Sequence, residues 1–310
     1  MYEMWLNPVP GVEAVPESVL PRESQDFGLE IEGAGSPQPF CAREYHERIR
    51  ALEEELSAMR REQSLIQRGF FEAAQIQRRL CAPRQFQTPE FEVAGEIFPV
   101  RHLSGDFFKV FELGSALGLI VGDIAGKGLS AGIWMPHLIS LVHSCARIHA
   151  DPAEALSAAN RKLITGCGEP PLAAVFYARL ERATGNITYC NAGLPSPLIL
   201  ARGRAVERLE TGGPMLGATA AATFHSGVAV IEEGDTLLAC SDGVTECENA
   251  AEQEFALAGL EKAARAFAGG SASQTLFATL GAVLDFADGR ALRDDLTLLV
   301  AERTAATILH

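Results

Sequence analysis

The feature that most constrains the fold is a series of short β-rich runs, joined by turn-forming residues, between residues 90 and 304. The sequences Thr184-Gly185-Asn186 and Arg202-Gly203 favour tight connections between antiparallel strands. Helical stretches separate other runs, which indicates an α+β layered domain rather than a doubly wound parallel sheet. The expected strands cover residues 117–121, 174–180, 187–191, 198–200, 236–239 and 296–301.

Two helices of this region carry clear sequence signals. One begins after Asp151, which is a suitable N-cap, with Pro152 at the first helical position and Glu154 three residues after the cap. A second helical stretch covers about residues 274–286. The apolar stretch 129–146 is interrupted by proline and histidine, so we interpret it as a buried helix and not as a membrane span.

Residues 42–83 form a separate segment with a heptad pattern. Apolar residues recur at alternating steps of four and three with charged residues beside them, and Pro83 ends the helix. The pattern fits a dimeric coiled coil and also a long helix that packs on its own domain. Two glutamines on the seam would weaken its packing and could set the register of a coiled coil or its choice of partner. The seam positions are Tyr45, Ile49, Leu52, Leu56, Met59, Gln63, Ile66, Phe70, Ala73, Gln77 and Leu80.

Composition excludes several classes of function. The net charge of −14 argues against nucleic acid and anionic membranes as partners, because both require clustered positive charge. The 7 cysteines include no C-x-x-C pair, which argues against zinc-ribbon and thioredoxin-type sites and suits reduced thiols. The N-terminus lacks the apolar core of a secretory signal, so we expect a cytoplasmic protein. Residues 1–41 are rich in proline, and we interpret them as a disordered or partner-docking tail.

Four aspartates stand beside glycine or a second aspartate, each next to an apolar run: Asp106, Asp123, Asp242 and Asp294. Each alone is explained by a turn or a helix cap. If the strand ends converge, each pair of carboxylates at about 4 Å would repel by roughly 4 kcal/mol at an effective dielectric near 20. Hard divalent cations would neutralise such a cluster, and oxygen ligands favour Mg²⁺ or Mn²⁺. Two such ions would activate water for hydrolysis of a phosphate ester.

Together these motifs resemble the SpoIIE/RsbU-type branch of the metal-dependent (PPM-type) protein serine/threonine phosphatases. The resemblance covers roughly residues 80–303 and depends on the order and spacing of six motifs. They are Ser104-Gly105-Asp106-Phe107-Phe108, Gly122-Asp123-Ile124-Ala125-Gly126-Lys127-Gly128, Asn191-Ala192-Gly193, Gly234-Asp235-Thr236-Leu237-Leu238, Ser241-Asp242-Gly243-Val244-Thr245-Glu246 and Asp294-Asp295-Leu296-Thr297.

The resemblance implies two packed antiparallel β-sheets flanked by helices, an αββα sandwich, in a phosphatase domain over residues 84–310. By motif match, Asp123 would bridge two Mn²⁺ or Mg²⁺ ions, with the carbonyl of Ile124 nearby. Asp242 and Asp294 would hold one ion, and Asp106 would support the other. Asp295 would either substitute for Asp294 as a metal ligand or support the ligands without contacting an ion itself. No side chain acts as the nucleophile in this family, because activated water attacks phosphorus.

Two basic residues are weaker candidates for contact with the substrate phosphate, namely Arg101 and Lys127, and a solvated side chain explains either one as well. The sequence also departs from the family pattern. Lys109 stands where an acid is usual, Leu194 where a histidine is usual, and Ala173 or Ala174 where a threonine is common. These changes affect no primary metal ligand.

The resemblance also implies a role in a bacterial partner-switching pathway. Substrates in this branch are typically phosphorylated anti-sigma-factor antagonists, and an activator or sensor acts through the linker helix. A homodimer would form through the heptad seam. The alternative is a degenerate phosphatase domain that acts as a non-catalytic binding module, and a phosphohydrolase for small molecules is a third reading.

Overall fold

The computed structural model describes residues 42–81, 83–166, 168–201, 204–267 and 270–304. The chain divides into two compact units, Met1–Ala58 and Met59–His310, which are described separately. In the first unit the described residues belong to helix α1 (Ala42–Leu80), whose remaining turns belong to the second unit. The predicted tail, residues 1–41, lies outside the described residues. The predicted boundaries at 41 and 83 stay predictions.

The second unit contains two antiparallel sheets. The six-stranded sheet has the order β1-β2-β11-β10-β7-β8, and the five-stranded sheet has the order β3-β4-β5-β6-β9. Their strands are β1 (Gln85–Gln87), β2 (Phe91–Phe98), β3 (Phe107–Leu113), β4 (Ala116–Ile124), β5 (Ala173–Glu181), β6 (Asn186–Ala192), β7 (Leu198–Leu200), β8 (Glu207–Arg208), β9 (Gly227–Val230), β10 (Thr236–Cys240) and β11 (Leu296–Arg303).

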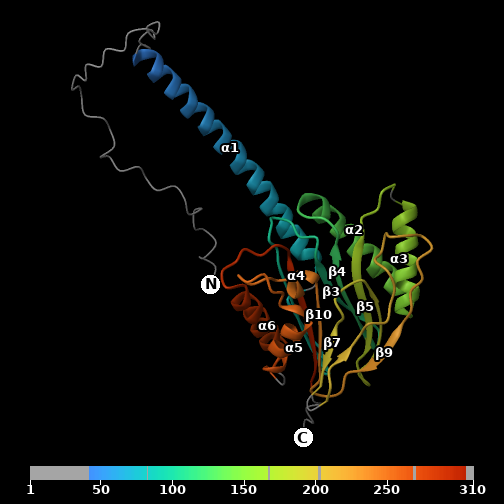
Figure 1. Cartoon of the computed structure of the whole chain (residues 1–310). Helices are drawn as coiled ribbons and strands as arrows, with labels where there is room; N and C mark the ends of the chain where they lie inside the picture. Colours follow the sequence, from blue (N-terminus) through green and yellow to red (C-terminus); the bar gives the residue numbers. More distant parts are fainter. Residues whose placement is uncertain (1–41, 82, 167, 202–203, 268–269, 305–310) are drawn as a thin grey trace. The chain divides into compact units, whose positions relative to one another are not determined.

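The sheets and helices of the second unit form four layers (Figure 1). A core of buried side chains lies between the two sheets, and it includes residues from β2, β3, β4, β5, β10 and β11. Helices α2 (Leu129–Ile148) and α3 (Pro152–Gly166) cover the outer face of the five-stranded sheet. Helices α4 (Asp242–Thr245), α5 (Ala256–Arg265) and α6 (Ala272–Ala287) cover the outer face of the other sheet. The predicted α+β sandwich is confirmed.

Strand β4 illustrates how the sequence produces these layers. Leu117, Leu119 and Val121 are fully buried in the core between the sheets, whereas Ile120 and Ile124 are buried against α2 and α3. Alternation places successive side chains on opposite faces of a strand. Because both faces are covered, the strand is apolar from Ala116 to Gly122, and burial of a large aliphatic side chain contributes about 1.5–3 kcal/mol.

Glycines on β4 create room for aromatic rings from β3. Phe107 pairs with Gly122 across the two strands, and a Cβ atom at Gly122 would lie 2.2 Å from Cζ of Phe107. Phe111 lies in the same way over Gly118, at 2.3 Å from the position of a Cβ. Any side chain at these glycines would displace a ring, so the register of β3 against β4 is fixed by shape as well as by hydrogen bonds.

The predicted helices are present with the expected caps. Asp151 Oδ1 accepts a hydrogen bond from the backbone N–H of Glu154 at 3.1 Å, which confirms the N-cap of α3. Helix α6 begins with a capping box formed by Ser271 and Gln274. The apolar stretch near residue 136 is helix α2, with Pro136 inside it. Across the described residues, no helix combines the length and apolar character that a membrane crossing requires.

The residues of the predicted seam of helix α1 are exposed in the first unit and partly buried in the last turns of the helix. In the first unit the seam residues Ile49, Leu52 and Leu56 are exposed, with 51 %, 52 % and 47 % of their surface accessible. In the second unit Phe70 stacks on His102 with ring centroids 5.4 Å apart, and Gln77 is buried. The last turns therefore pack on the rest of the second unit, and whether the seam also pairs with a second copy stays a prediction.

All six predicted strands are confirmed, with ends that differ by at most three residues. The turn at Thr184-Gly185-Asn186 joins β5 and β6, which pair antiparallel. The predicted turn at Arg202-Gly203 lies outside the described residues. The cysteines in the described part of the chain, Cys81, Cys145, Cys190, Cys240 and Cys247, are free thiols.

Candidate functional site

The first two candidate aspartates lie at neighbouring strand ends of the five-stranded sheet. The register pairs Phe107 with Gly122, so the next positions outward along the ladder are Asp106 and Asp123. Both lie on the strand faces that point into the core between the sheets, because Phe108 and Val121 of those faces belong to that core. The antiparallel ladder thus brings together two carboxyl groups that are 17 positions apart in the sequence.

The other candidate aspartates lie at the corresponding end of the six-stranded sheet. Cys240 pairs with Leu298, and beyond this pair the backbone N–H of Ser241 donates to the carbonyl of Thr297 at 3.0 Å. Asp242 follows Ser241 and begins α4. A Cβ at Gly243 would lie 2.1 Å from the carbonyl oxygen of Asp295, so only glycine permits this close approach.

The inner carboxyl groups, those of Asp106 and Asp123, have raised pKa values. Burial, and then the charge of Asp123, raise the pKa of Asp106 well above its ordinary value. The pKa of Asp123 is raised to about 6, mainly by burial and to a smaller extent by the charges of Asp242, Asp294 and Asp295, whereas a hydrogen bond with Asp106 acts in the opposite direction. Asp106 and Asp123 lie within hydrogen-bonding reach when one is protonated. With both ionised, Oδ2 of Asp106 is buried without a hydrogen-bond partner.

The outer carboxyl groups have partners from the protein. Asp294 Oδ2 lies 2.5 Å from the ammonium group of Lys127, which also donates to the carbonyl of Arg293 at 2.8 Å. Asp295 accepts hydrogen bonds from the backbone N–H groups of Val100 at 2.7 Å and Gly105 at 3.3 Å. Asp295 therefore ties the segment before Asp106 to the start of β11.

Asp242 interacts with both the inner and the outer carboxyl groups. Burial and the charge of Asp294 raise its pKa, whereas hydrogen bonding to Asp123 and the charge of Lys127 act in the opposite direction. All five aspartates therefore share one end of the sandwich, and the charges of Asp242, Asp294 and Asp295 act on the ionisation of Asp123. In the parts of the chain that the structure describes, no three His, Cys, Asp or Glu side chains are already gathered tightly enough to hold an ion.

The donor set still fits divalent cations. The buried, unpartnered Oδ2 of Asp106 is a strong acceptor without a donor, which is costly unless a cation or proton is nearby. The ammonium group of Lys127 lies against Asp294, which shows that this carboxylate is accessible to a cation. Carboxylate oxygens without nitrogen or sulfur favour Mg²⁺ and Mn²⁺ over zinc.

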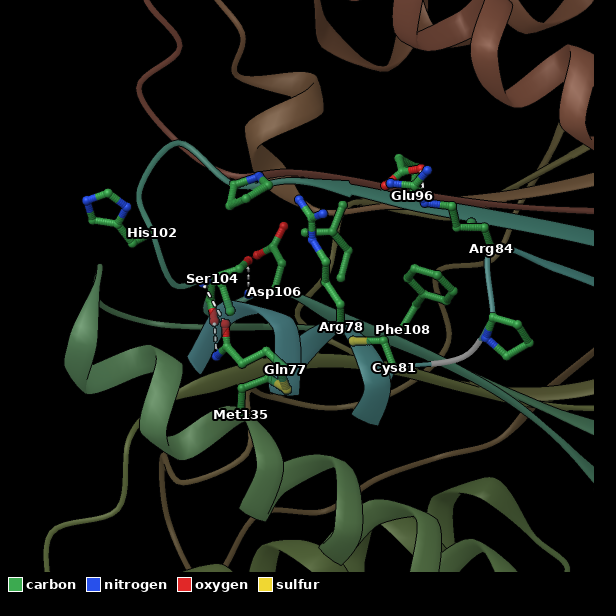
Figure 2. Close-up of a pocket in the computed structure, with 15 residues that line it drawn as sticks. Gln77, Arg78, Cys81, Arg84, Glu96, His102, Ser104, Asp106, Phe108 and Met135 are labelled. Atoms are coloured by element: carbon green, nitrogen blue, oxygen red, sulfur yellow. Dashed lines mark hydrogen bonds and ion pairs between the residues drawn. The ribbon is translucent and has the colours of Figure 1, made fainter. Parts of the chain in front are cut away.

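A cavity of about 160 Å³ lies beside this end of the sandwich (Figure 2). Asp106 and Ser104 line it together with Gln77 from α1. The side-chain amide of Gln77 donates to the carbonyls of Gly132 at 2.7 Å and Ser104 at 3.2 Å, and its oxygen accepts from the N–H of Ser104 at 3.2 Å. The predicted role of Gln77 in setting register or partner choice is untested, but its side chain holds the loop that precedes Asp106.

Arg101 and Lys127, the weaker candidates for contact with a substrate phosphate, also lie near this end of the sandwich. The guanidinium of Arg101 lies beside Gly128, with Nη1 3.5 Å from the position of a Cβ there. Arg101 and Lys127 therefore belong to adjoining segments. The carbonyl oxygen of Ile124 lies against Gly105, 3.0 Å from the position of a Cβ.

The three departures from the family pattern have structural roles here. Lys109 donates to the carbonyl of Leu80 at 3.2 Å and so caps the last turn of α1, where a positive charge is favourable. Leu194 is buried between the sheets, in a turn closed by Asn191. Ala174 pairs with Asp123 across the strands.

This fold is that of the PP2C-type protein phosphatases. The SiaA-PP2C domain of Pseudomonas aeruginosa matches 79 % of this chain and 98 % of its own, with a TM-score of 0.70 at 17 % identity. The RsbU and RsbW domains of Rv1364c from Mycobacterium tuberculosis match 72 % of this chain and 63 % of their own, with a TM-score of 0.62 at 26 % identity.

The chain belongs to the SpoIIE family, because the family model named for stage II sporulation protein E matches residues 114–304. The phosphoserine phosphatase RsbU of Bacillus subtilis (strain 168) is 24 % identical over 293 residues, which cover 94 % of this chain and 82 % of RsbU. The sequence-based resemblance is thereby confirmed.

Two further structures with this fold contain divalent ions. RsbX was solved in complex with magnesium, with a TM-score of 0.54 at 14 % identity. The catalytic domain of the serine threonine protein phosphatase PstP was solved with two manganese ions, with a TM-score of 0.50 at 14 % identity.

Proposed function

We propose that this chain is a Mn²⁺- or Mg²⁺-dependent serine/threonine protein phosphatase of a bacterial partner-switching pathway, acting in the cytoplasm. One observation carries the proposal: both sheets contribute aspartates to one end of the sandwich, where Oδ2 of Asp106 is buried without a partner. Membership of the SpoIIE family supports the reaction class.

The carboxylates have distinct proposed roles. Asp123 would contact both ions, with the carbonyl of Ile124 nearby, and Asp242 and Asp294 would hold one ion. Asp106 would support the second ion, and Asp295 would keep the segment before Asp106 in position through its two backbone hydrogen bonds. Divalent ions supply Lewis acidity, lowering the pKa of coordinated water and screening phosphoryl oxygens.

Two basic side chains would orient the substrate. Arg101 and Lys127 lie on adjoining segments at the rim of the acidic cluster. Arg101 has the geometry for a bidentate contact with a phosphoryl group. Lys127 becomes available for such a contact when a metal ion replaces it at Asp294.

The substrate would be a phosphorylated regulatory protein of the anti-sigma-factor antagonist type. The likeness to RsbU and to the RsbU domain of Rv1364c supports this assignment. The exposed seam residues of α1, such as Ile49 and Leu56, would form a coiled coil with a second copy. An activator or sensor would then act through the last turns of α1, which contact the loop before Asp106.

The test is phosphate release from such a phosphoprotein with and without Mn²⁺ or Mg²⁺. Wild-type protein should release phosphate only with the metal, and Asp123→Asn should abolish release. Asp285→Asn is the matched control, because Asp285 is exposed on α6 and belongs to no candidate site. Turnover by Asp123→Asn at the wild-type rate would refute the assignment.

The non-catalytic alternative makes the opposite prediction. A degenerate domain would bind its partner equally well in a chelator and would bind no divalent ion, which calorimetry measures. Lys109 and Leu194, the departures that motivated this alternative, have structural explanations in the capping of α1 and in the core. A comparison of phosphopeptide with nucleotide substrates separates a protein phosphatase from a small-molecule phosphohydrolase.

A further inference from the structure

A second cavity, which we call the polar groove, opens directly beside the acidic cluster. Its volume is about 190 Å³, and Asp294 and Lys127 belong both to its lining and to the cluster. A substrate whose phosphate lies at the aspartates would therefore extend neighbouring residues into this groove. The charged residues that line it further are Glu246, Glu248, Glu254, Arg290 and Arg293.

One wall of the polar groove is a short, well-ordered loop that follows α4. Glu248 and Glu254 form an antiparallel bridge, and the N–H of Phe255 donates to the carbonyl of Cys247 at 2.8 Å. Asn249 closes the tip through hydrogen bonds from Ala251 and Gln253 to its side-chain oxygen. The loop is therefore preorganised, which reduces the entropy cost of binding.

The arginines of the groove are engaged with that wall. Arg290 lies 2.9 Å from Glu248 and donates to the carbonyl of Asn249 at 2.6 Å. Arg293 also forms an ion pair with Glu248. These contacts join the loop to the segment that leads into Asp294, and they neutralise Glu248.

In the described part of the chain, two carboxylates of the groove are not paired with a basic side chain. Among the residues that the structure describes, the side chains of Glu246 and Glu254 form no ion pair and no hydrogen bond, and both residues are exposed. Desolvation, followed by the negative charges of Asp242, Glu254 and Asp294, raises the pKa of Glu246, and the positive charge of Lys127 opposes this only in part. Ions held by the aspartates would neutralise those aspartates but would leave Glu246 and Glu254 free for a cationic ligand.

We propose that the polar groove recognises a basic side chain next to the phosphorylated residue of the substrate, with Glu246 and Glu254 as the residues that determine this preference. The inference rests on the proposed phosphatase function and specifies its substrate class. Arginine suits the site well, because its guanidinium forms paired hydrogen bonds with carboxylates. Electrostatic complementarity of this kind contributes to specificity.

The experiment uses the full-length chain with Mn²⁺ and a series of phosphoserine peptides. A single arginine is moved along the residues that flank the phosphoserine, and glutamine or glutamate replaces it in matched peptides. We expect kcat/KM for the best arginine peptide to exceed that of its glutamine counterpart by about fivefold and that of its glutamate counterpart by more. The double variant Glu246→Gln/Glu254→Gln should reduce this ratio to near one.

Glu252→Gln is the control, since Glu252 is on the same loop, is exposed and does not line the groove. It should keep the wild-type ratio. A wild-type chain that hydrolyses neither the peptides nor p-nitrophenyl phosphate with Mn²⁺ would overturn the proposed function itself. Hydrolysis without an arginine preference, or a preference that persists in the double variant, would overturn only the inference about the groove.

Discussion

The inner carboxyl groups of the acidic cluster, those of Asp106 and Asp123, and the outer ones, those of Asp294 and Asp295, differ in how their negative charge is compensated. Asp294 and Asp295 are compensated by the protein, through the ammonium of Lys127 and through two backbone N–H groups. Asp106 is buried and Asp123 half-buried beside it, and burial raises both pKa values; the hydroxyl groups of Ser241 and Thr297 oppose this increase at Asp106. If the chain binds divalent ions as proposed, the inner pair would gain most from them, whereas the outer pair is held in place by the fold.

The largest expected effect comes from Asp106→Asn. With metal present, phosphatase activity should fall by more than about 100-fold, because a ligand of one ion is lost. Without metal the same variant should be more stable than wild type, because the cost of a buried carboxyl group beside the charge of Asp123 is removed. Activity assays and urea unfolding in a chelator measure the two effects. A metal-free variant that is less stable than wild type would contradict the proposed repulsion.

The pH dependence of the metal-free protein tests the inner pair directly. The pKa of Asp123 is about 6 in the folded state, above its ordinary value of 3.8, so the folded chain binds more protons than the unfolded chain between these values. Stability should therefore fall as pH rises from about 4 to about 6, by at most about 3 kcal/mol for this group. Saturating Mn²⁺ should weaken this contribution. Unfolding midpoints across pH for wild type and Asp123→Asn, in a chelator, isolate it.

A smaller effect is expected from Lys127→Met at the outer pair. The ammonium of Lys127 would compete with a bound metal ion for Asp294, and both side chains are nearly half exposed. Its removal should tighten Mn²⁺ binding by about threefold, as measured by calorimetry. Turnover should fall at the same time if Lys127 contacts the phosphate. Weaker Mn²⁺ binding in this variant would show that Lys127 supports the metal site.

Much of the fold and of the site was predictable, because local signals agreed with one another. Strand 198–200 followed from a short β-rich run beside turn-forming residues, and the N-cap at Asp151 followed from capping chemistry. The aspartates were recognisable because each stands at the end of an apolar run, and strand ends meet at the edges of a sandwich.

Other parts of the site were not accessible to that reasoning, because they depend on contacts between distant segments. The heptad pattern placed Gln77 on a seam, but it could not show that Gln77 hydrogen-bonds Ser104 and Gly132. Likewise, Asp295 was expected to substitute for Asp294 or to support it, and its bonds to Val100 and Gly105 appear only in three dimensions. Lys109 stood out only as an exception to the family pattern, whereas the structure shows it at the end of α1.

The fit of Phe107 over Gly122 links the two motifs that carry Asp106 and Asp123. A methyl group added at Gly122 would expel the phenyl ring, and the residue adjacent to that ring is a proposed metal ligand. A larger residue at position 122 would therefore require a smaller one at position 107, so a design that changes either position must treat Phe107 and Gly122 as a matched pair, although 14 residues separate them in the chain.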